Sequence, residues 1–280
     1  MTQVRLDVLV RNDKGFVQGL RAEDFLIEDE GKPVAVGYLG REDEDLNVLL
    51  LLDVSGSMKD YLTQIGRRAR VLLAQLRATD KVAVMGFAKV SDYLMPFTAN
   101  MDRAANAIDQ ALRPDLIPSG TSINAALVDA AQAFLDSPKL TGHRAIFILT
   151  DNKALNYRVS DETVLRQLFA ADAVLNSIVT RNAAPPKALK NPERRNPDFS
   201  WADVYKLSAE TGGEVLRTER ADEAFAKLLA NLRERYLITY KAPASNPGQY
   251  RKIRVSLTKE AGKKYGKLTI RARAGYYTSS

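Results

Sequence analysis

Two hydrophobic patterns divide the chain. In the middle, continuous apolar runs such as "VLLLL" at 48–52 alternate with segments whose apolar residues recur at helical spacing, for example Leu62, Ile65 and Ala69. Runs without a polar face are typical of strands buried on both sides of a parallel sheet, and the spaced segments are typical of helices that cover such a sheet. Residues 46 to about 233 therefore predict an α/β fold with a doubly wound, mostly parallel sheet flanked by helices.

The elements expected in this part follow from the same patterns. Ser160 is predicted to cap one helix, and the proline-rich stretch 181–198 is predicted to be a long loop. The helix at 201–211 places Trp201 toward the core. Strands are expected at 46–52, 81–87, 91–97, 143–151, 174–180 and 214–218, and helices at 58–76, 101–112, 122–135, 161–173, 201–211 and 221–236.

The two ends of the chain show only strand-like alternation and turn residues. Residues 1–45 carry six Lys and Arg against eleven Asp and Glu, whereas residues 233–280 carry twelve against two. Neither end has enough strands for a stable sheet pair, but together they have about six, and their charges are complementary. We therefore predict a small β-sandwich formed by residues 1–44 and 234–280, with the α/β domain, 45–233, inserted between its two parts.

Composition removes several classes of function. The chain has no cysteine and one histidine, His143, which excludes disulfides, thiol nucleophiles and cysteine- or histidine-rich zinc sites. His143 is expected to mark the start of a strand. Basic residues near the C-terminus alternate with apolar ones, as on the solvated face of a strand, so nucleic-acid binding is not expected despite the net charge of +7. No apolar run is long enough to span a membrane, and no export signal opens the sequence.

Oxygen-bearing side chains gather where predicted buried strands end. Asp53, Ser55 and Ser57 follow the first strand, Thr121 lies on a glycine-bearing loop that enters a helix, and Asp151 ends the "FILTD" strand. The carboxyl ends of parallel strands share one edge of a sheet, so these side chains are expected to converge. Two carboxylates and three hydroxyls suit Mg²⁺, with room for waters and one outside ligand. The alternative is that Ser and Thr only cap the strand ends. Asp80 is expected to be a turn residue rather than a ligand.

In this order and on these elements, the five residues resemble the metal-ion-dependent adhesion site (MIDAS) of von Willebrand factor type A domains. The flanking segments further resemble the bacterial VWFA-related acidobacterial domain proteins. The resemblance implies that Ser55, Ser57 and Thr121 bind the metal directly and that Asp53 and Asp151 act through waters. The metal would be Mg²⁺, with Mn²⁺ or Ca²⁺ as alternatives. A protein partner's exposed Asp or Glu would complete its coordination.

The resemblance also sets expectations for the rim of the site and for the location of the protein. The family often has glycine after the last aspartate, where this chain has Asn152, which tolerates a left-handed backbone; Asn152 and Lys153 are expected to alter access or charge. Arg194 and Arg195, in the long loop, are candidates for docking an acidic partner. An exported, adhesive bacterial protein is implied, with a cytoplasmic location left open.

No nucleophile, second metal or phosphate-binding loop indicates an enzyme, so we expect a non-enzymatic interaction module. A metal-dependent phosphoester hydrolase and a scaffold for a separate ATPase are the alternatives. The oligomeric state stays open.

Overall fold

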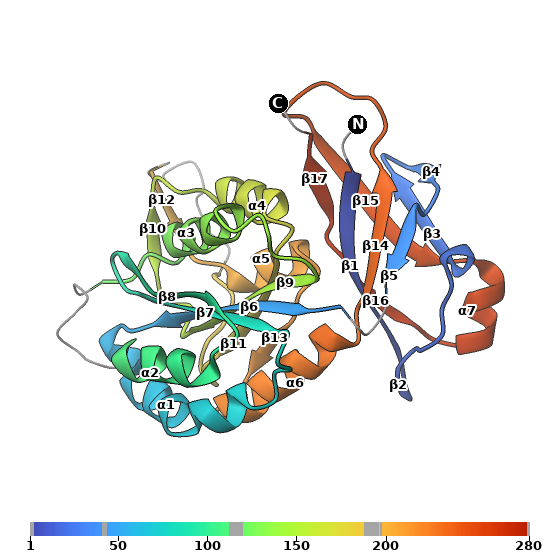
Figure 1. Cartoon of the computed structure of the whole chain (residues 1–280). Helices are drawn as coiled ribbons and strands as arrows, with labels where there is room; N and C mark the ends of the chain where they lie inside the picture. Colours follow the sequence, from blue (N-terminus) through green and yellow to red (C-terminus); the bar gives the residue numbers. More distant parts are fainter. Residues whose placement is uncertain (1–2, 41–43, 112–119, 188–195, 197, 279–280) are drawn as a thin grey trace.

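The computed structural model describes residues 3–40, 44–111, 120–187, 196 and 198–278 (Figure 1). At the centre of its α/β part is a six-stranded sheet with the order β13-β11-β9-β6-β7-β8. The first five strands in this order run parallel, and the edge strand β8 runs antiparallel to β7. This is the predicted doubly wound, mostly parallel sheet. Its strands are β6 (Leu46–Asp53), β7 (Lys81–Phe87), β8 (Ser91–Thr98), β9 (His143–Thr150), β11 (Val174–Val179) and β13 (Val215–Arg217).

Both faces of this sheet are covered by helices. All eight residues of β6 are buried, with Leu50 and Leu52 in the cluster on one face and Leu49 and Leu51 in the cluster on the other. This explains why the strand has no polar face in the sequence. The helices on the first face are α1 (Lys59–Leu73), α2 (Met101–Ala111) and α6 (Ala221–Arg233), and those on the second are α3 (Ile123–Leu135), α4 (Asp161–Ala170) and α5 (Val204–Glu210).

Capping side chains fix where two of these helices begin. Ser160 accepts a hydrogen bond from the backbone N–H of Thr163, 3.1 Å away, which confirms the predicted cap of α4. Asp203 accepts from the N–H of Lys206 at 3.0 Å, so α5 begins later than the sequence pattern indicates. Trp201 consequently lies in a strand, β12 (Phe199–Trp201), which pairs with β10 (Leu155–Tyr157). Trp201 is 54% exposed, so the expectation that it belongs to the core was wrong.

Strands from the two ends of the chain pair with each other in two further sheets. One has the order β16-β1-β14-β5, with β2 also on β1, and the other has the order β17-β15-β3-β4. Side chains from both sheets meet in one hydrophobic cluster that includes Val8, Ile27 and Ile253. These strands are β1 (Gln3–Asn12), β2 (Gly15–Phe16), β3 (Phe25–Asp29), β4 (Lys32–Val34), β5 (Tyr38–Gly40), β14 (Tyr236–Lys241), β15 (Tyr250–Leu257), β16 (Thr269–Arg271) and β17 (Gly275–Tyr277).

Two features of the terminal sheets differ from expectation. A helix, α7 (Lys259–Tyr265), lies between β15 and β16, where Thr258 caps it by accepting from the N–H of Ala261. Arg251 is nearly buried, although the alternating pattern predicts that it faces solvent. Its guanidinium donates to the fully buried carboxylate of Asp29 at 2.7 Å. A buried cation is tolerated here because its charge is paired across the two strands.

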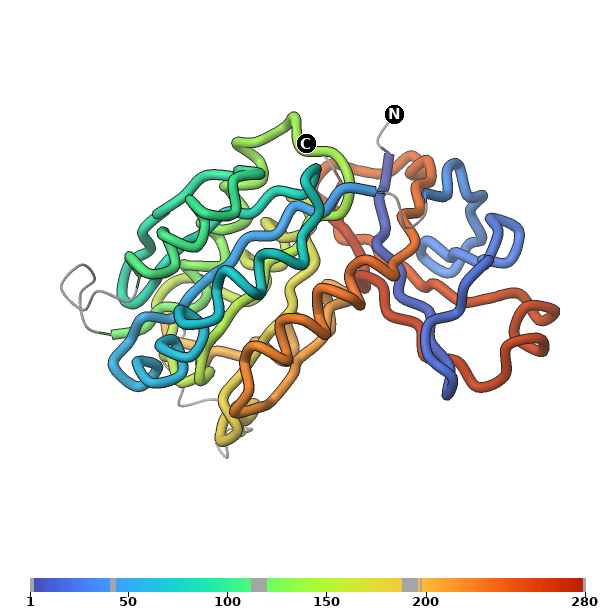
Figure 2. The backbone as a smooth tube through the Cα atoms, turned by 60° about the horizontal axis from the view of Figure 1, so that its bottom comes forward, coloured from blue at the N-terminus to red at the C-terminus, as the bar shows by residue number. Residues whose placement is uncertain are grey.

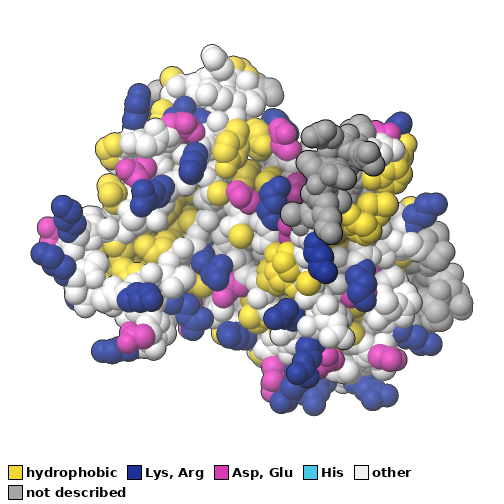
Figure 3. Space-filling model, turned by 180° about the vertical axis from the view of Figure 1, so that it is seen from behind, with side chains coloured by type: hydrophobic (Ala, Val, Ile, Leu, Met, Phe, Trp, Pro, Cys, Tyr) yellow, Lys and Arg dark blue, Asp and Glu magenta, His cyan; other side chains and the backbone are white. Residues whose placement is uncertain are grey.

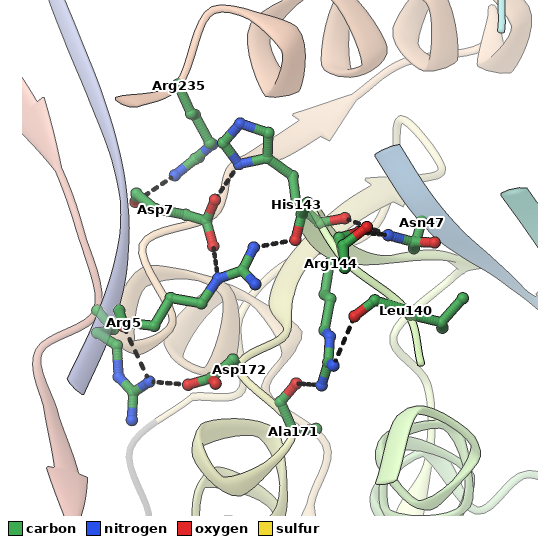
Figure 4. A network of polar contacts seen from close by, with 12 residues as sticks. Arg5, Asp7, Asn47, Leu140, His143, Arg144, Ala171, Asp172 and Arg235 are labelled. Carbon is green, nitrogen blue, oxygen red and sulfur yellow. Dashed lines mark hydrogen bonds and ion pairs between the residues drawn. The ribbon is translucent and has the colours of Figure 1, made fainter. Parts of the chain in front are cut away.

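The terminal sheets meet the α/β part at the amino ends of its parallel strands (Figure 4). Asp7, on β1, contacts the Nδ1 atom of His143, the first residue of β9, and both side chains are buried. Arg235 donates to the backbone oxygen of Asp7 at 3.1 Å and to that of Gly212 at 2.7 Å. Burial disfavours ionised Asp7, but contact with His143 and the charges of Arg5 and Arg235 outweigh it and lower the pKa of Asp7.

A second link between the two parts is covalent. Helix α6 leads almost directly into β14, and Figure 2 shows it running from the sheet face to the terminal strands. Near its end, Arg233 pairs with the buried carboxylate of Asp80, which also accepts from the N–H groups of Leu46 and Arg77. Asp80 is thus a turn residue, as predicted. None of the helices in the described ranges combines the length and apolar character that a membrane crossing requires.

Candidate metal centre

Asp53 ends β6 and is completely buried. Its Oδ1 atom accepts from the N–H of Ser55 at 3.1 Å, and its Oδ2 atom accepts from the hydroxyl of Thr150 at 2.7 Å. Burial raises the pKa of Asp53 and the nearby charge of Asp151 adds to the rise, against the lowering effect of these hydrogen bonds. A buried carboxylate next to a second one is poorly compensated, and a cation at this position would relieve the repulsion.

The two serines stand at the surface directly after the strand. Ser55 is half-buried and Ser57 is exposed, and their hydroxyl oxygens lie 3.3 Å apart. The N–H of Val54 donates to the oxygen of Phe87 at 2.8 Å, which holds the chain against the end of β7 before the turn into α1. The alternation of the sequence thus points one carboxylate inward and leaves two hydroxyls accessible.

Thr121 comes to the same edge from a distant loop. Gly120 has a φ of 108°, which L-residues rarely adopt, and this lets the loop turn toward the helix that follows. The N–H of Ser122 then donates to the oxygen of Ala88 at 2.8 Å, at the end of β7. Because β7 pairs with β6 up to Asp53, this hydrogen bond brings the half-buried Thr121 to the strand ends that carry Asp53.

Asp151 follows β9 and is 4% exposed. Its Oδ1 atom accepts from the N–H of Lys153 at 3.0 Å, and its Oδ2 atom lies 3.6 Å from the Lys153 ammonium, whose side chain is 71% exposed. Lys153 therefore supplies positive charge beside the Oδ2 atom of this carboxylate. At such an exposed position this pair is weak.

Asn152 has a φ of 58°, which shows that it takes the left-handed conformation that glycine often supplies. Its amide group, however, points inward. It donates to the oxygen of Ala184 at 3.0 Å and accepts from the N–H of Val204 at 3.2 Å. Asn152 thus ties together the loops behind the centre and is buried, instead of forming an accessible rim. Arg194 and Arg195 lie outside the described residues.

The donor set fits a hard divalent cation. It consists of oxygen atoms only, with the charged ones buried and the neutral hydroxyls more accessible, and it includes no cysteine or histidine. Within the described ranges, no group of three or more Asp, Glu, His or Cys side chains is placed so that it could hold a metal ion by itself. Any cation at this edge would therefore depend on Ser55, Ser57 and Thr121 together with the two aspartates.

Sequence reasoning missed Thr150. The parallel register that places Leu149 beside Leu52 also sets Thr150 beside Asp53, and its hydroxyl accepts from the N–H of Asn152 at 3.1 Å while donating to Asp53. A hydroxyl residue directly after the apolar run at 145–149 was the available signal. Its role does not follow from the local pattern, because the partner lies 97 residues away.

Comparisons with known proteins agree with the fold. Residues 48–153 match the family model described as "von Willebrand factor type A domain". Over 135 residues the chain is 30% identical to the E3 ubiquitin-protein ligase WAVH1 of Arabidopsis thaliana, a match that covers 44% of this chain and 20% of that protein. The chain thus corresponds to only about a fifth of the length of that relative.

Two solved structures show the same fold at lower identity. An aerotolerance-related membrane protein from Bacteroides fragilis superposes with a TM-score of 0.52 and 22% identity, over 68% of this chain and 99% of that one. Proximal thread matrix protein 1 from the mussel byssus, solved with a zinc-occupied MIDAS motif, gives a TM-score of 0.52 and 14% identity, over 73% of this chain and 50% of that one.

Proposed function

We propose that the chain is a non-enzymatic module, built on a domain that matches the von Willebrand factor type A family model over residues 48–153, and that it binds a protein partner through a metal-bridged carboxylate. Domains of this type typically mediate protein–protein interaction and adhesion. What supports the proposal is that the hydroxyls of Ser55 and Ser57 lie 3.3 Å apart directly after Asp53 at the end of β6, that the charge of Asp151 acts on Asp53, and that the N–H of Ser122, next to Thr121, is bonded at the end of β7.

The proposed roles follow from burial and from the hydrogen bonds that are already made. Ser55, Ser57 and Thr121 would hold the cation directly, because their oxygens are the accessible ones. Both oxygens of Asp53 already accept hydrogen bonds from protein groups, which favours contact with the cation through water. When bound, the metal supplies an electrophilic position for a carboxylate oxygen from outside. Few charged ligands touch it, so it retains attraction for that carboxylate.

Mg²⁺ is the proposed ion, with Mn²⁺ and Ca²⁺ as alternatives, because all three accept oxygen ligands. The zinc in the mussel protein's MIDAS motif supports occupancy of such a motif by a divalent ion and does not choose among these three. Lys153 is proposed to tune the site by competing for Asp151.

We also propose that the terminal segments form a separate β-sandwich domain. Its parts would be residues 1–44 and 234–280, with the type A domain, 45–233, inserted between them. The antiparallel pairing of β1 with β14 and the cluster shared by the two sheets support this division. An exported location remains a prediction, which cell fractionation would test.

Calorimetry of the full chain with MgCl₂ tests the metal centre. Ser57→Ala should weaken Mg²⁺ binding by about tenfold or more, because it removes one ligand. Ser245→Ala, at an exposed serine in the β14–β15 loop, is the matched control and should bind as the unaltered chain does. Absence of Mg²⁺ binding, or equal binding by both variants, would overturn the metal assignment.

Carboxylate capture needs its own measurement. A synthetic peptide with one glutamate among glycines and serines should bind the chain in Mg²⁺ but not in chelator, and its glutamine counterpart should not bind in either. Equal binding of the glutamate peptide in Mg²⁺ and in chelator would contradict the proposal. Turnover of a generic phosphoester that disappears in Asp53→Ala would favour the hydrolase instead, and co-purification with an ATPase would favour the scaffold.

A further inference from the structure

A small ribbon beside the candidate metal centre exposes large apolar side chains. Strands β10 and β12 pair so that Leu155 faces Trp201 and Tyr157 faces Phe199. Leu155, Tyr157 and Trp201 are 45%, 49% and 54% exposed, and the rings of Tyr157 and Phe199 lie 5.1 Å apart. We call these four residues the aromatic ribbon. Seen from behind in Figure 3, hydrophobic side chains gather at the upper right, the end of the molecule where β10 and β12 lie.

The ribbon is firmly anchored to the loops that carry the metal centre. Between the outward Leu155 and Tyr157, the side chain of Asn156 points inward and is 1% exposed. It accepts from the N–H of Asn124 at 3.0 Å, in the first turn of α3 and three residues after Thr121. The N–H of Ala202 donates to the oxygen of Ala154 at 3.0 Å. An isolated two-stranded ribbon is marginally stable, so these contacts are what hold it in place.

The distance from the ribbon to the metal centre is short. Leu155 comes four positions after Asp151, and four steps of fully extended chain span at most about 14 Å. A partner segment in extended conformation, at about 3.3 Å per residue, could therefore reach both places with side chains no more than about four positions apart.

Two accessible cations stand beside the ribbon, and each is paired with a carboxylate. Lys153 and Arg158 have side chains that are 71% and 67% exposed, and the guanidinium of Arg158 lies 4.9 Å from the centre of the Tyr157 ring. Arg158 also pairs with Asp198 at 3.7 Å. Apolar rings flanked by accessible cations complement a segment that combines an acid with a large apolar residue.

We propose that the aromatic ribbon is the second half of the ligand-binding face, where it takes a large apolar side chain from the same protein segment whose carboxylate reaches the metal centre. This inference rests on the proposed function and narrows the partner. The occupant is an acidic protein segment with an aromatic or large aliphatic residue within about four positions of its Asp or Glu. Trp201 and Leu155 provide most of the apolar contact, as the centre of an interface usually does.

Selection of peptides on the unaltered full chain tests the inference without any mutation. A library of displayed random twelve-residue peptides is bound in MgCl₂ and eluted with chelator. The selected peptides should carry an acidic residue with an aromatic or large aliphatic residue within four positions. Selected acids without such a neighbour would overturn the role of the ribbon and leave the proposed function standing. Failure to obtain peptides that chelator releases would count against the proposed function itself.

Variants then locate the contact. A synthetic peptide with the selected sequence should bind Trp201→Ser and Leu155→Ser about tenfold more weakly, with Mg²⁺ affinity unchanged by calorimetry. Leu26→Ser is the matched control, since Leu26 is a strand residue that is 40% exposed in the terminal sheets, and its affinity should not change. Equal peptide affinity for all three variants, each folded by circular dichroism, would overturn the inference.

Discussion

Replacing Asp7 by asparagine should destabilise the chain more than any comparable change of a surface acid. The carboxylate is buried between His143, Arg5 and Arg235, where the terminal sheets meet the α/β part. Asparagine keeps the shape and the backbone acceptor for Arg235 but removes the negative charge. Removing one partner from a buried ionic group costs about 3–5 kcal/mol, because the remaining cations stay desolvated.

The lower end of that range applies here. Arg5 also donates to the oxygen of Gly142 and Arg235 to that of Gly212, so both keep partners after the change. We expect a loss of about 3 kcal/mol in the free energy of unfolding. At about 2 °C per kcal/mol for a chain of this size, the melting temperature should fall by roughly 6 °C.

The pH dependence gives this prediction a second test. Since the folded-state pKa of Asp7 lies below its unfolded value of about 3.9, its stabilisation is complete above that value and is lost as pH falls through the folded-state pKa. The difference between the unaltered chain and the variant should therefore be full at pH 7 and shrink below about pH 4.

Urea unfolding followed by circular dichroism measures both quantities. Asp13→Asn, at the exposed turn between β1 and β2, is the control and should change stability by less than about 0.5 kcal/mol. A loss below about 1 kcal/mol for Asp7→Asn, or one that does not vary with pH, would refute the view that this buried charge holds the two parts together.

Three further outcomes can be checked by similar means. Thr150→Val should lower the free energy of unfolding in urea by about 2 kcal/mol, because it removes the hydroxyl that bonds a buried oxygen of Asp53 and the N–H of Asn152. A loss under about 0.5 kcal/mol would show that these two hydrogen bonds do not stabilise the fold. Lys153→Met should tighten Mg²⁺ binding about two- to fivefold by calorimetry, because the exposed ion pair of Lys153 with Asp151 is worth less than about 1 kcal/mol. Weaker Mg²⁺ binding by this variant would contradict the idea that Lys153 competes with the cation for Asp151. Asp29→Asn should lower the free energy of unfolding by about 3 kcal/mol, because this residue of β3 accepts hydrogen bonds from Tyr240, Arg251 and Tyr276. Amide hydrogen exchange in the terminal strands should become faster, and unchanged exchange there would show that the two ends of the chain are not coupled through Asp29.

The local sequence pattern was sufficient to predict several elements of the α/β part. The strand predicted at 81–87 has those same bounds in the structure, and Ser160 caps the helix that the sequence assigns to it. Asn152 adopts the left-handed backbone expected of it. Each of these features depends on residues a few positions apart, because strand periodicity, helix capping and backbone conformation are determined by near neighbours. For the same reason, the sequence alone is enough to assign Asp53 and Asp151 to strand ends and Thr121 to the loop before a helix.

Tertiary structure decided which distant residues meet. Nothing near His143 in the sequence points to Asp7, and the alternation around Arg251 is that of a solvent-facing residue although its guanidinium pairs with buried Asp29. Trp201 was misplaced because a three-residue strand, held by pairing with Leu155–Tyr157, displaced the first turn of the predicted helix. Hydrophobic periodicity states which face of an element is buried but not what covers it, and a partner more than a hundred residues away is selected only when the chain closes into one packed structure.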